Sequence, residues 1–396
     1  MKAPGFAAAS ALRAALLTIA TIALASFEAR AQSAAERIAA LLEGSGVVLA
    51  EAPHLPRESL RRLYEARGGA PLWVEGNMPS PTGWAMASLI FRAGEQGLNP
   101  EKYYASQIQA RALTRTERSA AELDLLLSAG LLGYAADLGS GRLEPKKTDP
   151  ELFAYPDPPD PVATLLATLE SGDPAGALAA LAPPHEGYRR LRGLLARYRT
   201  IADAGGWPQV ADGAKLERGD QGPRVETLRR RLAATGDLDS KSASGALFDE
   251  TLEQAVERIQ ARLGLEVDGI VGKNTLAALN TSVEQRIRQI QVNMERWRWL
   301  PRDLGKRHIF INAADFRLAL VEAGSPVLEM RVVVGRPYRR TPQFSENMNH
   351  IIVNPDWTVP PKLARQDILP KVRENPSYLA EHNFTVFSGW SAEARR

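Results

Sequence analysis

The spacing of hydrophobic residues changes once along the chain. From Glu36 to Tyr198 the pattern is leucine-rich and helical, interrupted by loops that contain proline and glycine. From His308 to Val334 apolar residues instead alternate with polar ones, which is the period of a β-strand. The pattern predicts an α+β multidomain protein, with a mostly α-helical first part and a β-rich last part.

The clearest helix of the first part is predicted over Ala121–Leu138, and Gly139–Gly141 is predicted to end it. Residues 150–161 (PELFAYPDPPDP) hold five prolines and are predicted to form an irregular connection. The first part also carries aromatic residues that could form a sugar-stacking surface or pack between short helices, and packing is the favoured interpretation. These aromatic residues are Trp73, Trp84, Tyr103 and Tyr104.

Residues 216–280 are predicted to form a compact domain of three short helices. The first helix would bury Val225, Leu228 and Leu232 on one face. Asp249 is predicted to cap the second helix, Gly264 to end it, and Lys273–Leu279 to form the third. The apolar residues of the second helix recur at helical spacing: Leu252, Val256, Ile259 and Leu263.

Residues 281–300 are predicted to form one more amphipathic helix, and 281–307 to link two domains. The apolar stripe of this helix is Val283, Ile287, Ile290, Met294 and Trp297. Near its end, two tryptophans alternate with two arginines. The stripe is interpreted as a packing face, and a stack of guanidinium on indole is the alternative.

The β-rich part is predicted to contain three neighbouring strands and a fourth further on. The predicted strands are His308–Asn312, Phe316–Glu322, Val327–Val334 and His350–Asn354. Ala323–Pro326 would form the hairpin turn between the second and third strands. A short helix over Ser377–Glu381 is predicted after Asn375 and Pro376. We expect the segment after about Arg307 to be less stable than the domains before it, because its strands leave unpaired edges.

Charge and composition limit the function classes. The chain of 396 residues has a formal net charge of +3 and no cysteine. This charge gives no support to nucleic-acid binding, and the cysteine count excludes disulfides and thiolate metal sites. Residues 1–31 are predicted to be a secretory signal peptide, with a positive start, an apolar run over Ala14–Ala25 and small residues before position 32. An uncleaved signal would instead anchor the chain in the inner membrane.

Two strings in the three-helix domain carry a family resemblance, LERGDQGPRV at 216–225 and DGIVGKNTLAALN at 268–280. With the helix between them, they resemble the type 1 peptidoglycan-binding domain. The motif residues implied by the resemblance are Gly219, Asp220, Gly222, Asp268, Gly269 and Gly272. Most matched residues are core and turn positions, so the resemblance identifies the module better than its binding groove.

The last part of the chain resembles L,D-transpeptidases of the long periplasmic type. The strings are MERWRW at 294–299, LEMRVVVGRPYRRTPQFS at 328–345 and NPDWTVPPKLARQDILPK at 354–371. Residues 70–73 (APLW), 97–100 (GLNP) and 141–145 (GRLEP) resemble the helical scaffold domain of the same family. The resemblance implies a scaffold domain over 36–200, a peptidoglycan-binding domain over 216–280 and a catalytic domain over 308–396.

Catalysis in that family is acyl transfer between peptidoglycan stem peptides through a cysteine thioester, at a Ser-His-Gly-Cys-x-Arg motif. The chain contains neither that motif nor a cysteine. We therefore expect the catalytic domain to be truncated before this motif and the chain to be inactive. No catalytic residue is assigned. Neither the five histidines nor Ser388 and Ser391 offer a replacement nucleophile with a paired base, and no metal or cofactor is expected.

The resemblance implies peptidoglycan as the partner, both glycan strands and stem peptides, in the periplasm. Arg339, Arg340, Asn354 and Trp357 are the candidate substrate-binding residues, because they lie in the strings that resemble the catalytic domain. Arginines there would attract a carboxylate, although loop geometry fixed by proline and aromatic packing explains the same strings. The alternative to a transpeptidase polypeptide is a non-catalytic scaffold protein that binds the cell wall.

Overall fold

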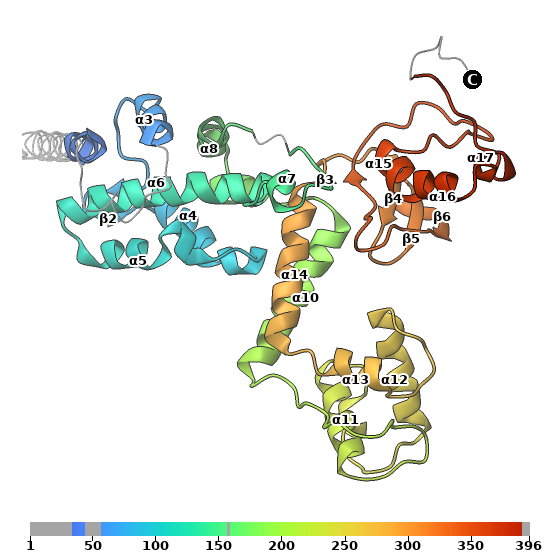
Figure 1. Ribbon diagram of the computed structural model, residues 1–396. Coiled ribbons are helices and arrows are strands. Elements are labelled where there is room, and N and C mark those ends of the chain that lie inside the picture. The colour runs from blue at the N-terminus through green and yellow to red at the C-terminus, as the bar shows by residue number, and fades with distance from the viewer. Residues whose placement is uncertain (1–33, 44–56, 157–158, 390–396) are drawn as a thin grey trace, which may run out of the picture. The chain divides into compact units, whose positions relative to one another are not determined.

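The computed structural model describes residues 34–43, 57–156 and 159–389. The predicted signal segment, His54 and Ser391 lie outside these residues. The chain divides into two compact units, Met1–Ser345 and Glu346–Arg396, and each is described by itself. The predicted α+β multidomain class is confirmed (Figure 1). Within the described ranges, no helix combines the length and the apolar character that crossing a membrane requires.

The scaffold region of the first unit is built around one long helix, α6 (Glu117–Ser140), most of whose residues are buried. Around it lie a helix over residues 34–43 and these elements: α3 (Arg57–Glu65), β1 (Val74–Glu75), β2 (Met78–Pro79), α4 (Pro81–Phe91), η1 (Ala93–Gln96), η2 (Pro100–Tyr103), α5 (Ala105–Thr114), α7 (Pro145–Thr148), β3 (Leu152–Phe153), α8 (Pro161–Glu170) and α9 (Pro174–Ala179). The predicted helix over Ala121–Leu138 is shorter than α6 at both ends, but Gly141, one of the residues predicted to end it, does so. The helix continues through Gly139 and ends before Gly141, whose φ of 89° leaves the helical region.

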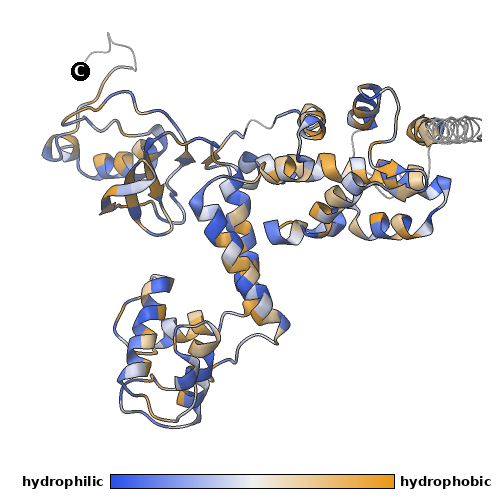
Figure 2. Ribbon diagram, turned by 180° about the vertical axis from the view of Figure 1, so that it is seen from behind, coloured by the Kyte–Doolittle hydropathy of each residue, from blue (hydrophilic) through white to orange (hydrophobic). Residues whose placement is uncertain are grey.

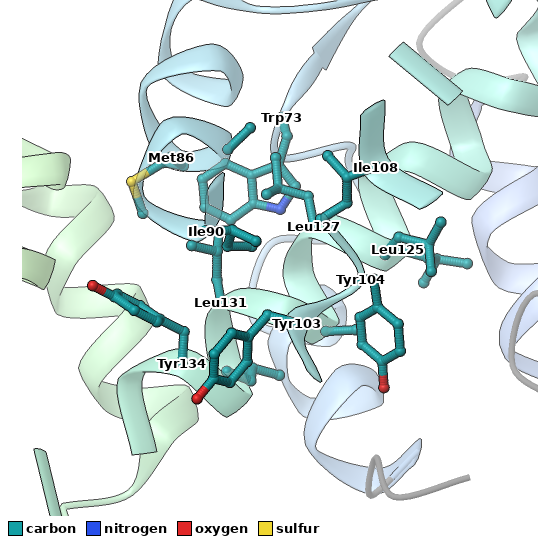
Figure 3. Close-up of a cluster of buried hydrophobic side chains, with 14 of the residues drawn as sticks. Trp73, Met86, Ile90, Tyr103, Tyr104, Ile108, Leu125, Leu127, Leu131 and Tyr134 are labelled. Carbon is teal, nitrogen blue, oxygen red and sulfur yellow. The ribbon is translucent and has the colours of Figure 1, made fainter. Parts of the chain in front are cut away.

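The aromatic residues of the scaffold pack inside it, as Figure 3 shows for Trp73, Tyr103 and Tyr104. Trp73 is fully buried, and its indole N–H donates to Ser128 Oγ at 2.8 Å. The backbone N–H of Trp73 donates to the buried carboxylate of Asp124 at 2.7 Å. Trp84 alone among the four is exposed, at 44%. The packing interpretation is therefore confirmed for three of the four aromatic residues.

Two long helices, α10 (Glu186–Asp203) and α14 (Val283–Arg298), lie side by side in antiparallel directions (Figure 1). The predicted stripe of α14 faces α10, and the pair shares a core with Tyr188, Leu195 and Trp207. At the end of α14, Trp297 stacks on Phe310 with ring centroids 5.6 Å apart, and Arg298 lies over Tyr188 at 5.5 Å. The alternative of a guanidinium–indole stack is wrong for Arg298, because a phenol ring on α10 takes that place.

The three-helix domain lies between α10 and α14 in sequence and consists of α11 (Pro223–Ala234), α12 (Glu250–Leu263) and α13 (Lys273–Leu279). Its predicted core is confirmed, since Val225, Leu228 and Leu232 are fully buried. Asp249 caps α12 by accepting the N–H of Leu252 at 2.9 Å, and Gly264 ends it with a left-handed φ of 69°. Local signals therefore located the three α-helices of this domain, but not the short 3-10 helix η3 (Ser240–Ser242) in the loop between α11 and α12.

A three-stranded antiparallel sheet follows, in the order β4 (Arg307–Asn312), β5 (Arg317–Glu322), β6 (Ser325–Arg331). The predicted four-residue turn is wrong, because Ser325 already pairs with Glu322. Only Ala323 and Gly324 form the turn, and both have the positive φ of a two-residue hairpin. Phe316 also lies outside its predicted strand, in a turn with φ 55°. Figure 2 shows hydrophobic residues along these strands, and Ile311 and Val327 are more than half exposed.

The second unit contains short helical turns: α15 (Pro361–Leu363), the π-helical turn η4 (Ala364–Ile368), α16 (Leu369–Glu374) and α17 (Tyr378–Glu381). The helix predicted over Ser377–Glu381 begins one residue later, at Tyr378, and Asn375 accepts the N–H of Ser377 at 3.0 Å in the turn before it. The predicted strand over His350–Asn354 is wrong. Within the described part of this unit no other strand pairs with it, and Asn354 adopts a left-handed φ of 51°. Ile351 and Val353 are consequently exposed, at 77% and 80%.

Candidate functional site

The four candidate substrate-binding residues are divided between the two units. Arg339 and Arg340 lie in the first unit, before the short strand β7 (Gln343–Phe344), and Asn354 and Trp357 lie in the second. Arg340 forms an ion pair with Asp149 of the scaffold, and the Arg339 guanidinium lies 5.9 Å from the centroid of the Tyr338 ring. Trp357 is 66% exposed. Their assignment to substrate binding therefore stays a prediction.

The segment around β7 is held against the scaffold. Residues of β7 pair in parallel with β3, with Gln343 opposite Leu152. The backbone N–H of Gln343 donates to the carbonyl of Glu151 at 3.0 Å, and its side-chain oxygen accepts from Arg296 on α14 at 2.6 Å. The proline-rich connection thus contributes the short strand β3, with which β7 pairs. The connection, α14 and β7 are distant in sequence and meet at this point (Figure 1).

A cleft of about 910 Å³ opens where these regions meet. Its floor is the C-terminal half of α14, and its walls are the loop from η1 to η2, the segment from Arg142 to Leu152 and the residues around β7. Two acidic residues, Asp149 and Glu295, line it. Five arginines line it as well: Arg142, Arg199, Arg288, Arg296 and Arg340. We call it the arginine cleft.

The acidic residues of the arginine cleft are already engaged by the protein. Glu295 is buried, and its carboxylate accepts from Arg298 at 2.8 Å and from the backbone N–H groups of Arg142, at 2.5 Å, and Leu143, at 3.0 Å. Asp149 is paired with Arg340. The electrostatic potential inside the cleft is therefore positive, which favours anionic ligands.

The six residues of the predicted peptidoglycan-binding motif lie in the turns of the three-helix domain. The side chain of Gln260, 1% exposed, accepts the N–H groups of Asp268 and Gly269 and donates to Asp268 Oδ1 at 2.7 Å. Hydrogen bonds from the N–H of Ile270 and from Gln260 lower the pKa of Asp268. Asp268 is thereby kept ionised at the surface while its backbone is fixed.

The other half of the motif forms a turn next to residues 246–248. The N–H of Gly219 donates to the carbonyl of Phe248 at 2.9 Å, and the carbonyl of Asp220 accepts the N–H of Phe248 at 2.8 Å. Gly219 and Gly222 have φ of 96° and 131°, which only glycine adopts readily. Gly272 immediately precedes α13 with an extended backbone. These six residues determine the backbone of the domain, and their role in ligand binding stays a prediction.

Among the described residues, no cluster of three or more His, Asp or Glu side chains could hold a metal ion. His185 packs on Trp297, and His382 stacks on Tyr378 with ring centroids 4.1 Å apart. His308 Nδ1 lies 3.1 Å from the carbonyl oxygen of Gly305. These contacts engage three of the described histidines in ring packing or in a local hydrogen bond.

The sequence interpretation missed the arginine cleft. On α14 the prediction rested on the apolar stripe and on the tryptophans and arginines at its end, whereas Arg288, Gln291 and Glu295 recur at helical spacing on another face of the helix. That second stripe was a signal available from the sequence. The segments that lie opposite it could not be identified from the sequence, because the walls come from residues about 45 to 200 positions away.

Comparison with known families finds three sequence models along the chain. Residues 58–195 match a scaffold domain, 221–279 match a "Putative peptidoglycan binding domain" and 306–395 match an L,D-transpeptidase catalytic domain. These are the kinds of domain, in the same order, that the sequence strings resemble.

Curated relatives are similar to this chain over parts of its length. A "Putative L,D-transpeptidase" of Haemophilus influenzae is 37% identical over 107 residues, which are 27% of this chain and 22% of the relative. The N-acetylmuramoyl-L-alanine amidase CwlM of Mycobacterium tuberculosis is 40% identical over 80 residues, 18% of this chain and 20% of the relative. The amidase CwlL of Bacillus licheniformis is 41% identical over 68 residues, 17% and 19% respectively. The chain thus spans about a fifth of the length of these relatives.

Proposed function

The chain belongs to the L,D-transpeptidase family, and from this premise we propose that it is a peptidoglycan-binding protein of the bacterial cell wall. The observation that carries the proposal is the three-helix domain, which has its own closed core and matches a peptidoglycan-binding family. We further propose that residues 216–280 bind the wall, 281–307 link this domain to the β-rich part, and 36–200 act as scaffold.

We also propose that the chain does not form L,D cross-links alone. A cysteine thioester requires a thiolate, and the sequence contains no cysteine. Its part in cross-linking would then be to bind and position peptidoglycan. Measuring muropeptides by mass spectrometry after incubation with the purified chain tests this, and newly formed L,D cross-links would contradict it.

Export is part of the proposal, because peptidoglycan lies outside the cytoplasm. The predicted signal over residues 1–31 supports it, and an uncleaved signal would anchor the chain in the inner membrane. Fractionation of cells that express the chain, followed by N-terminal sequencing, separates the two forms. Recovery in the cytoplasm with an intact N-terminus would contradict export.

The structure offers a direct test of wall binding, because the two ends of the three-helix domain meet. Trp207 Nε1 donates to the carbonyl of Thr281 at 3.1 Å, and the backbone of Val210 bonds in both directions to the side chain of Asn280. A short glycine-rich linker can therefore replace residues 211–279 while α10 and α14 stay paired. We expect the deletion variant to sediment with purified sacculi far less than the full chain does. Equal sedimentation of both would refute the proposal.

A further inference from the structure

We propose that the arginine cleft is a second binding site, for a peptide that carries free carboxylates, and that its ligand is the stem peptide of peptidoglycan. This goes beyond wall binding by the three-helix domain, since no residue of 211–279 lines the cleft. It rests on the proposed function only for the choice of stem peptide among acidic peptides.

The charge of the cleft is the first argument. Five arginines and two acidic residues line it, and both acidic residues are bound within the protein. Arg288 makes no hydrogen bond and no ion pair to any residue that the structure describes, and its side chain is exposed on α14. Arg142 lies 4.0 Å from Glu295, at the limit of an ion pair. Both guanidinium groups retain donors for a carboxylate, which they can bind through two parallel hydrogen bonds.

The apolar residues of the cleft are the second argument. Val292 on α14 and Leu143 on the opposite wall are 59% and 47% exposed, and Leu98 and Leu152 also line the cavity. Small hydrophobic surfaces next to arginines suit a peptide whose methyl groups and carboxylates alternate. A volume of about 910 Å³ is at the upper end of the range for ligand sites, which allows several residues of an extended peptide.

The aromatic content of the cleft argues for a peptide rather than a glycan strand. A sugar ring is usually bound against the exposed face of an aromatic side chain. Trp299 is the only aromatic residue among those that line the cleft, and it is 7% exposed. Its indole nitrogen would lie 2.7 Å from a Cβ at Gly141, so the ring is packed tightly against that backbone. The described walls therefore offer no stacking platform for a sugar.

The test is calorimetric titration of the full chain with three probes: a purified tetrapeptide stem, the same peptide with its carboxylates amidated, and glycan strands stripped of peptide. We expect the free peptide to bind and the amidated peptide not to bind. Any binding of stripped glycan should come from the three-helix domain and disappear when residues 211–279 are deleted. Arg288→Gln should raise Kd about tenfold, the size of one charge-assisted hydrogen bond. Adding Arg142→Gln should raise it about tenfold again. The backbone N–H that Arg142 donates to Glu295 is kept in this variant.

The matched control is Arg190→Gln. Arg190 is an exposed arginine on α10, paired with Glu186 in solvent and about 180° around the helix from Arg199. We expect its Kd to equal that of the unaltered chain. Absence of peptide binding, equal affinity for the amidated peptide, binding of stripped glycan instead, or an unchanged Kd for Arg288→Gln would each overturn the proposal.

The cleft and the three-helix domain can fail separately. The variant that lacks residues 211–279 should still bind the free peptide, because the cleft is outside the deletion, although far less of it should sediment with sacculi than of the full chain. Peptide binding that disappears with the deletion would place the site in the three-helix domain and refute the cleft. Sacculus binding that the deletion does not reduce would refute the proposed function and leave the cleft supported by its own titration.

Discussion

The buried ion pair at the end of α14 should be the interaction that fixes this helix to the scaffold. Arg298 and Glu295 have side chains only 1% and 5% exposed. The Arg298 guanidinium donates to Glu295 at 2.8 Å, to the carbonyl of Gln96 at 2.5 Å and to the hydroxyl of Tyr188 at 3.0 Å. One side chain thus joins η1, α10 and α14.

Replacing Arg298 with methionine fills much of the same volume but leaves a buried carboxylate without its guanidinium partner. Glu295 would retain two backbone N–H donors and Arg142 at 4.0 Å. Breaking a buried pair on one side costs about 3–5 kcal/mol. For a cooperative unit of 150–250 residues, that lowers the melting temperature by about 6–20 °C. Adding Glu295→Gln should recover about 2 kcal/mol, since the amide oxygen still accepts both N–H groups and no charge stays buried.

The assay is urea unfolding combined with hydrogen exchange, which locates the loss. We expect faster exchange in peptides from α10 and α14 and unchanged exchange in α11 to α13. The matched control is Arg296→Met, two residues earlier, because Arg296 is exposed and bonds only to Gln343 among the described residues. That change should cost less than about 1 kcal/mol. A cost for Arg298→Met no larger than for Arg296→Met would refute the reasoning.

Three further predictions concern other parts of the chain. Burial, and after it the nearby charge of Arg302, lowers the pKa of His185 in the folded chain. As pH falls, His185 therefore takes up its proton in the unfolded chain before it does so in the folded chain, and stability should fall as pH drops below about 6.5. Melting curves at pH 5 to 8 should show a smaller pH dependence of stability in His185→Phe, and an unchanged dependence would contradict this. Gln260→Ala should lower the free energy of unfolding in urea by about 2–4 kcal/mol, because the hydrogen bonds of Gln260 to Asp268 and Gly269 are buried. The control Gln254→Ala, at an exposed position on the same helix, should be nearly neutral. Equal losses in the two variants would show that these hydrogen bonds matter little. Limited proteolysis should cut residues 308–389 before 216–280, since no described residue after Trp299 is fully buried, and equal resistance would disprove the lower stability of that segment.

The helices were predictable because their signals are local. Asp249 and Gly264 mark the two ends of α12 by side-chain capping and by backbone freedom, and both act within a few residues. The same holds for Lys273–Leu279, whose bounds the structure reproduces. Periodicity and caps therefore sufficed for the three-helix domain.

Strands and the cleft were less predictable because they depend on distant partners. His350–Asn354 has the composition of a strand, but no described strand lies beside it to form a ladder. The two-residue turn at Ala323 and Gly324 follows from the pairing of Ser325 with Glu322, which composition alone does not determine. The arginine cleft likewise depends on β7 pairing with β3, a contact across about 190 residues.

The placement of the three-helix domain has a mechanical consequence. Both of its connections reach the same end of the antiparallel helices, where Trp207 meets Thr281. A pull on a wall-bound domain would therefore load α10 and α14 together and in the same direction, so the two helices would not slide past each other. The load would be shared between two covalent connections, one leading to the scaffold and the other to the β-sheet. A protein tied to a wall under turgor would thus transmit tension to both of its other parts at once.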